Sequence, residues 1–244
     1  AFVRRMNKRA QQLGLRNTHF DNPSGLDGKT HHTTAQELAQ RRRESEGWAF
    51  LPAPMAHAAL DAERVLAETG DARRSDLLVD AACFARQLEL AQASGCQILA
   101  DYVRALIDGA NLKSLVRTLR LKKDAAFLRE LLLPGGTVSP ERIVQHGFSS
   151  SAAELFAGSA LAQSAQAAEA AAAGGSLTEL ERLCDNAALN VIGRARRVPF
   201  GVEVPVGYVA ARENELMSVR LVITGLLAGI PADQIRERLR ETNG

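Results

Sequence analysis

Hydrophobic positions recur every three or four residues along most of the chain, which is the spacing of an amphipathic α-helix. Helix-starting residues stand between these stretches at Asp80, Asp124, Ser139 and Ser176, and Gly70 is a typical stop. The pattern predicts helices over residues 55–69, 80–94, 96–121, 124–133, 140–147, 151–158, 160–173, 177–192, 206–228 and 231–241. No segment alternates with a period of two for long, so we expect an all-α protein.

The first fifty residues differ from the rest. Helical spacing over residues 1–14 is followed by a loop over 17–33 that is rich in Asn, Asp, Pro and Gly, and Thr34 with Glu37 then starts a second helix. The segment holds nine Lys/Arg and five Asp/Glu and so carries +4, whereas the rest of the chain carries −2, which gives the net charge of +2. Gly47, Pro52 and Pro54 predict a domain boundary near residues 44–54. We therefore expect a segment 1–45 that packs weakly against a helical region 50–244.

Two predicted helices have unusual surfaces. Residues 206–228 are apolar around much of the helix, which predicts burial on more than one side. Glu213 and Arg220 lie along the same apolar stripe, where an internal ion pair, snorkelling ends or a charged seam used in assembly would each explain them. Residues 160–173 contain nine alanines, offer little bulk to bury, and predict a poorly anchored helix.

The two longest predicted helices share a pattern. Asn111 precedes Arg117 by six residues, Asn214 precedes Arg220 by six, and a short break follows each helix before another helix. This repeated spacing is consistent with two copies of one helical unit, over about 55–150 and 151–244, or with chance in a chain rich in Leu and Arg.

Candidate chemistry is sparse. Gly28-Lys29-Thr30 lacks the preceding glycine of a phosphate-binding loop, and His31-His32 has no partner motif for a metal. Cys83, Cys96 and Cys184 form no metal knuckle or disulfide framework and indicate a reducing cytosol. Arg41–Arg43 and the cluster at 194–197 lack interleaved aromatics, and the chain is not strongly basic overall, so we expect no nucleic-acid partner. No catalytic, cofactor-binding or metal site is predicted.

No membrane span is expected, because the most apolar run, Val219–Ile230, is too short and is broken by Arg220. No signal peptide is predicted either. The chain begins with Ala1, as a piece of something longer would.

Residues from about 50 onward resemble the C subunit of V-type and archaeal-type rotary ATPases, which is called the d subunit in vacuolar enzymes. The residues that carry this resemblance are Gly70-Asp71, Asp80 to Phe84, Asp101-Tyr102, Ile107 to Lys113, Arg117, Pro134-Gly135-Gly136, Val198 to Glu203, Tyr208, Ala211 to Glu215, Arg220, and Ile235 to Arg240. The proline that usually follows the glutamate is displaced to Pro205.

This resemblance implies two of three similar domains of a funnel-like connector. Such a connector is non-catalytic, binds the central-shaft subunits and the membrane ring of proteolipid subunits, and lies on the cytoplasmic side of the membrane without a span of its own. It implies a seam for partner binding or internal structure, formed by Asn111, Arg117, Glu213, Asn214, Glu215, Arg220 and Arg236.

Residues 1–40 instead resemble a fragment of a D-alanyl-D-alanine carboxypeptidase, through Phe2-Val3, Met6-Asn7, Asn22-Pro23, Gly25-Leu26 and Thr33-Thr34-Ala35. Such an enzyme needs an S-x-x-K nucleophile, an S-x-N element and K-T-G, none of which occurs in the chain. A cell-wall protein fragment and an unrelated helical scaffold are the alternatives to the connector. A natural fusion, a truncated gene and a misassembled sequence would each produce this join.

Overall fold

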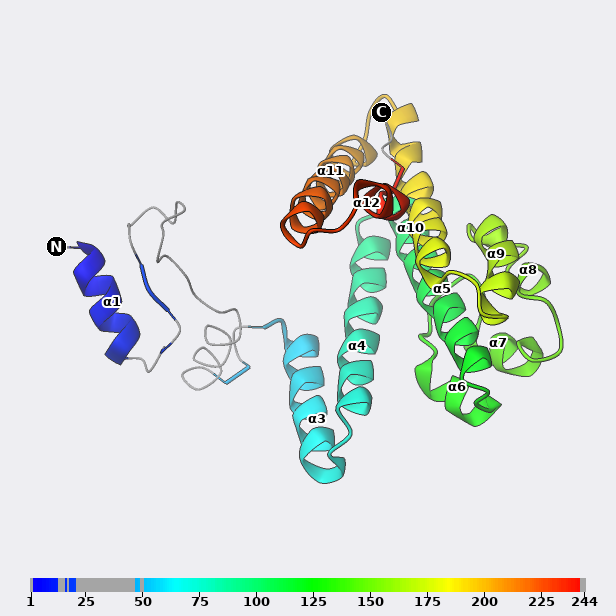
Figure 1. The fold of residues 1–244 in the computed structure, drawn as a ribbon, viewed down its shortest axis with the longest axis horizontal. Helices are drawn as coiled ribbons and strands as arrows, with labels where there is room; N and C mark the ends of the chain where they lie inside the picture. Colours follow the sequence, from blue (N-terminus) through cyan, green and yellow to red (C-terminus); the bar gives the residue numbers. More distant parts are fainter. Residues whose placement is uncertain (1, 13–15, 17, 21–46, 49–50, 242–244) are drawn as a thin grey trace. The chain divides into compact units, whose positions relative to one another are not determined.

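A computed structural model describes residues 2–12, 16, 18–20, 47–48 and 51–241 (Figure 1). The chain divides into two compact units, Ala1–Val79 and Asp80–Gly244. The described elements are α-helices and one short 3₁₀ helix, with no strand element among them, so the predicted all-α class is confirmed. The expected loop 17–33 falls mostly, and the helix from Thr34 wholly, outside the described residues.

The first unit contains α1 (Phe2–Gln12), α3 (Ala53–Thr69) and the beginning of α4 (Ala72–Ala93). Gly70 ends α3 as expected, with φ of 67° and its N–H donating to the carbonyl of Leu66. The Ser75 hydroxyl donates to the carbonyl of Ala62 at 3.0 Å. This bond ties the beginning of α4 to α3.

The second unit contains the remaining elements. They are α5 (Gln97–Arg120), α6 (Ala125–Leu131), α7 (Pro140–His146), α8 (Ala152–Leu155), α9 (Ala162–Ala172), α10 (Leu177–Gly193), η1 (Arg194–Arg197), α11 (Glu203–Leu227) and α12 (Ala232–Arg238). Asp124, Ser139 and Ser176 cap α6, α7 and α10 by accepting a backbone N–H three residues ahead, as their positions predicted.

Four predicted boundaries were wrong by three residues or more. The helix expected over 231–241 ends at Arg238, with Leu239 as its C-cap. Asp80 is not a cap, because no helix breaker stands between Ala72 and Val79 and α4 runs through both. The helix expected over 151–158 ends at Leu155, with Phe156 as its C-cap. The helix expected from residue 206 begins at Glu203, since Pro205 lies in the first turn, where a missing N–H leaves no bond unmade.

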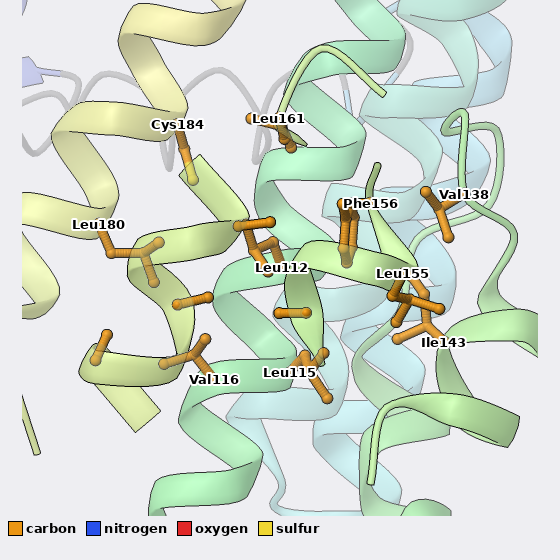
Figure 2. Packing of buried hydrophobic residues seen from close by; sticks show 14 of the residues in the cluster. Leu112, Leu115, Val116, Val138, Ile143, Leu155, Phe156, Leu161, Leu180 and Cys184 are labelled. Carbon is orange, nitrogen blue, oxygen red and sulfur yellow. The ribbon is translucent and has the colours of Figure 1, made fainter. Parts of the chain in front are cut away.

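The core of the second unit is built around α5, which is covered on two sides. One hydrophobic cluster joins Leu112, Leu115 and Val116 of α5 to Leu180 and Cys184 of α10 and to residues of α6 to α9 (Figure 2). A second cluster joins Ala100, Val103 and Ile107 to the second half of α4. The central helix is thereby held between layers on both sides.

The alanine-rich helix α9 is firmly anchored, so the expectation of a poorly anchored helix was wrong. Ala165, Ala168 and Ala171 are buried in the cluster around α5, and the Ser164 hydroxyl donates to the carbonyl of Leu183 at 3.0 Å. Small side chains let the backbones approach closely, so contact with the neighbours replaces the missing side-chain bulk.

Helix α11 also departs from expectation, since its apolar stripe is exposed. Leu216 is 68% and Leu227 83% exposed, and Val209, Val219 and Ile223 are about half exposed. Within α11 the buried residues are Gly207, Asn214 and Gly225, which lie on the opposite side of the helix. The prediction of burial on more than one side was wrong, because the pattern reports apolar surface and not whether this chain covers it.

Candidate interaction surface

Asn111 is a fully buried clamp in the middle of α5. Its Nδ2 donates to the carbonyl of Leu133, and the N–H of Leu133 donates to its Oδ1, both at 2.8 Å. The amide thus satisfies both backbone groups of one residue in the segment that follows α6. Asn111 therefore has a structural role in this unit.

Asn214 of α11 makes a related contact. Its Nδ2 donates to the carbonyl of Glu241 at 3.2 Å, and the N–H of Glu241 donates to the Oδ1 of Asn186 at 2.9 Å. Asn111 and Asn214 both lie on a long helix, and both bind the backbone just after the seven-residue helix that follows. Leu128 in α6 and Ile235 in α12 are the buried residues at the same place in those two short helices.

Arg117 and Arg220, the two arginines of the repeated Asn-to-Arg spacing, lie in different surroundings. The Arg117 guanidinium donates to Glu181 of α10 at 2.7 Å in an exposed ion pair. Arg220 and Glu213 are both exposed, and no ion pair joins them in the described part of the chain. An internal ion pair, one of the three explanations for these charges on the apolar stripe, is therefore not what the structure shows.

Glu215 and Arg236 make only local ion pairs. Glu215 bonds Arg212 three residues earlier, and Arg236 bonds Asp233 at 2.9 Å three residues earlier. Both pairs are exposed, where solvent screening leaves ion pairs with little effect on stability. The seven seam residues thus lie in different environments, and α11 contributes four of them.

Three of these four residues, Glu213, Asn214 and Arg220, line an open groove between α5, α10 and α11. The groove has a volume of about 880 Å³. Its apolar lining includes Leu106, Ala188 and Leu216. Its charged and polar lining includes Tyr102, Asp185, Glu213, Asn214, Arg220 and Arg240, while Glu215 lines a smaller neighbouring hollow.

Sequence reasoning missed several of these groups. Arg240 bonds Asp185 at 2.7 Å, with both side chains about 30% exposed, and so fastens the C-terminal segment to α10. Burial, and secondarily the charges of Glu213 and Asp185, raise the pKa of Tyr102. Tyr102 and Arg240 were among the residues that carry the family resemblance, but the sequence did not show that they lie near Asp185.

Asp108 was a second omission. It is fully buried on α5, and its Oδ1 accepts the N–H of Val138 at 3.1 Å while its Oδ2 has no hydrogen-bond partner. Burial raises the pKa of this carboxyl, against the lowering effect of the hydrogen bonds from Val138 and Thr137. A Cβ on Gly136 would lie 2.3 Å from Oδ1, so the loop after Pro134 can approach Asp108 only with glycine there.

The described residues hold no cluster of three or more His, Cys, Asp or Glu side chains able to bind a metal ion. Burial raises the pKa of the Cys184 thiol to about 11, so it is protonated at neutral pH. Gly28-Lys29-Thr30, His31-His32 and Arg41–Arg43 lie outside the described residues. Over the part of the chain that the structure describes, no helix is both long and apolar enough to span a bilayer.

Comparison with known proteins gives two matches at the N-terminus. Residues 1–46 match the D-alanyl-D-alanine carboxypeptidase family model. Over 43 residues the chain is 46% identical to D-alanyl-D-alanine carboxypeptidase DacF of Bacillus subtilis, which is 18% of this chain and 11% of that protein. The predicted resemblance of this short segment is confirmed.

The larger match covers most of the chain. Over 145 residues it is 27% identical to the C subunit of the A-type ATP synthase of Thermococcus onnurineus and 26% identical to that of Desulfurococcus sp.. Each alignment covers 57% of this chain and 38% of the relative, so the chain spans well under half the length of these proteins. Residues 36–238 match the family model of the ATP synthase (C/AC39) subunit, beginning ahead of the expected residue 50, and the chain belongs to that family.

Proposed function

We propose that the chain is a non-catalytic connector in the central stalk of a V/A-type rotary ATPase, joining the rotor shaft to the membrane ring of proteolipid subunits. The family match over residues 36–238 is the observation that carries the proposal. The C subunits of A-type ATP synthases among its relatives support it.

The packing of the second unit suits a part that transmits force. Helix α5 is buried between two hydrophobic clusters, and the Asn111 amide fixes the following segment through two hydrogen bonds of 2.8 Å. Close-packed interiors have low compressibility and transmit strain. A torque-bearing connector uses such packing and needs no nucleophile.

We further propose that α5–α6 and α11–α12 are equivalent parts of two repeats, over about 55–150 and 151–244, with residues 1–45 as a separate fragment. The related contacts of Asn111 and Asn214 support this division, as do Leu128 and Ile235. The groove between α5, α10 and α11 is then a candidate binding surface for other subunits of the complex.

The proposed connector lies at the cytoplasmic face of the membrane and is held there by the ring. Co-purification tests this assignment. An affinity-tagged chain, expressed together with the remaining subunits of a V/A-type ATPase, should recover shaft and ring subunits. A matched chain with Asn111→Ala and Asp108→Ala, which disrupts the core of the second unit, is the control. Equal recovery by the two chains, or recovery of no rotor subunit, would contradict the proposal.

A further inference from the structure

Helix α11 packs against its own unit through the face that carries Gly207, Asn214 and Gly225. A Cβ on Gly207 would lie 2.7 Å from the Cβ of Ala195, and one on Gly225 would lie 2.8 Å from Ile235. Asn214 is buried on the same side and binds Glu241. These close contacts fix one face of the helix and leave the opposite face open.

The open face has the heptad spacing of a coiled coil. Val209, Leu216 and Ile223 recur every seven residues and occupy the a positions of a heptad. Val219 and Leu226 occupy d positions, and a and d are the two apolar positions of a coiled coil. All of these side chains are about half exposed or more. At 1.5 Å per residue the row of apolar side chains from Val209 to Leu226 is about 26 Å long. Soluble monomers rarely expose such a continuous apolar surface.

Charges beside this row of apolar side chains indicate what covers it. Glu213 and Arg220 occupy successive e positions of the heptad, immediately after the d positions. They carry opposite charges. If a second α11 lies antiparallel so that Leu216 faces Val219 of the other helix, Glu213 of each copy lies beside Arg220 of the other. The surface is therefore complementary to itself in electric charge.

Parallel pairing is disfavoured by Arg212. This residue occupies a d position, so a parallel pair would place two Arg212 side chains opposite one another between the two helices. In the antiparallel arrangement Arg212 instead faces Ile223 of the second copy, and its guanidinium keeps its bond to Glu215. Charge and spacing thus select one orientation.

We infer that two copies of this chain associate in solution through the exposed face of α11, as an antiparallel helix pair with two reciprocal Glu213–Arg220 ion pairs. A two-fold axis near residues 216–219 relates the copies, which makes the interface closed and limits the assembly to a dimer. The same face of α11 lines the groove between α5, α10 and α11 through Glu213, Leu216 and Arg220, so pairing and the binding of another partner in that groove exclude one another.

Charge reversal tests the arrangement in the full chain by sedimentation equilibrium between about 1 and 100 μM. Glu213→Arg or Arg220→Glu alone replaces both ion pairs by repulsion and should raise the dissociation constant at least about tenfold. The double variant restores opposite charges and should return it to within about threefold of the parent. Arg129→Glu, at an exposed position of α6, is the matched control and should leave it unchanged.

Both reversed residues are exposed, so the variants should keep the far-ultraviolet circular dichroism of the parent. A monomer over the whole range would overturn the inference and mean that a different partner covers this face. A dimer that both single reversals leave intact would overturn the α11 interface.

Disulfide trapping tests the orientation in a Cys83→Ser chain, since Cys96 and Cys184 are buried. Leu216→Cys lies near the two-fold axis and should cross-link two copies on oxidation. Leu227→Cys should not, because its counterpart is about 28 Å away along an antiparallel pair. Efficient cross-linking at residue 227 would show a parallel pair and contradict the arrangement.

Discussion

Asn111 and Asn214 occupy related places in the two long helices but differ in how much each contributes. Asn111 is fully buried and makes two hydrogen bonds of 2.8 Å, whereas Asn214 makes one of 3.2 Å at the edge of the unit. Asn111→Ala leaves two buried backbone groups unpaired and should lower the free energy of unfolding by about 2–4 kcal/mol, while Asn214→Ala should lower it by about 1 kcal/mol.

Urea denaturation of the full chain measures both values. Asn190→Ala, at an exposed position of α10, is the matched control and should stay within about 0.5 kcal/mol of the parent. Equal effects of Asn111→Ala and Asn190→Ala would show that the clamp does not hold the segment after α6.

Asp108 predicts a pH-dependent stability. Because burial raises the pKa of its carboxyl above the ordinary value of 3.8, the folded state holds this proton more tightly than the unfolded state. The stability contributed by Asp108 is complete below that value and is lost as the pH rises through the raised pKa. Asp108→Asn keeps an oxygen for the Val138 N–H and cannot ionise.

The free energy of unfolding of Asp108→Asn should therefore increase relative to the parent as the pH rises from about 4 to 7. Parallel urea titrations at several pH values give this difference. A difference that stays constant with pH, or one that falls, would contradict a raised pKa for Asp108.

Helices and their caps could be predicted from the sequence, but the coverage of their faces could not. Ser139 and Ser176 cap helices because an N-cap depends only on a few neighbouring residues. The apolar surface of α11 is equally visible in the sequence, yet its exposure depends on which other segments are present. The burial of α9 was not predicted, because the sequence shows the small volume of its alanine side chains but not how closely the neighbouring helices approach its backbone.

Close approach at α9 makes a specific prediction. Ala168 is buried against the core, so Ala168→Leu adds volume without space and should destabilise the chain by about 1–3 kcal/mol. Ala170 lies two residues further along the same helix and is exposed, so Ala170→Leu should change stability by less than about 0.5 kcal/mol. Thermal denaturation compares the two, and equal melting temperatures would mean that α9 is not packed as described.

The candidate surface was predictable only in part, for the same reason. The sequence identified Glu213 and Arg220 because charges interrupted an apolar stripe, and Asn111 because its spacing to Arg117 repeats that of Asn214 to Arg220. It did not reveal the ion pair between Asp185 and Arg240, since these residues are 55 positions apart and only the fold brings them together.

At the scale of the whole molecule the two matched families make different demands on the chain. A carboxypeptidase acylates a serine with penicillin, and this requires a lysine to take the serine proton. No serine in the chain precedes a lysine by three residues. Incubation with a fluorescent penicillin should therefore leave no covalent label, with a competent carboxypeptidase as the positive control. A stable label would show that the fragment 1–46 belongs to a working active site.

The connector proposal is tested most directly by the affinity of the chain for the purified central-shaft subunits of a V/A-type ATPase. The chain covers 38% of the length of its A-type ATP synthase relatives, so it should bind the shaft more weakly than a version extended by a complete N-terminal domain of the family, because less surface is buried. Removing residues 1–45 should leave the affinity of the chain unchanged. Weak binding by the chain and tighter binding by the extended version would support the account, whereas negligible binding by both would contradict it.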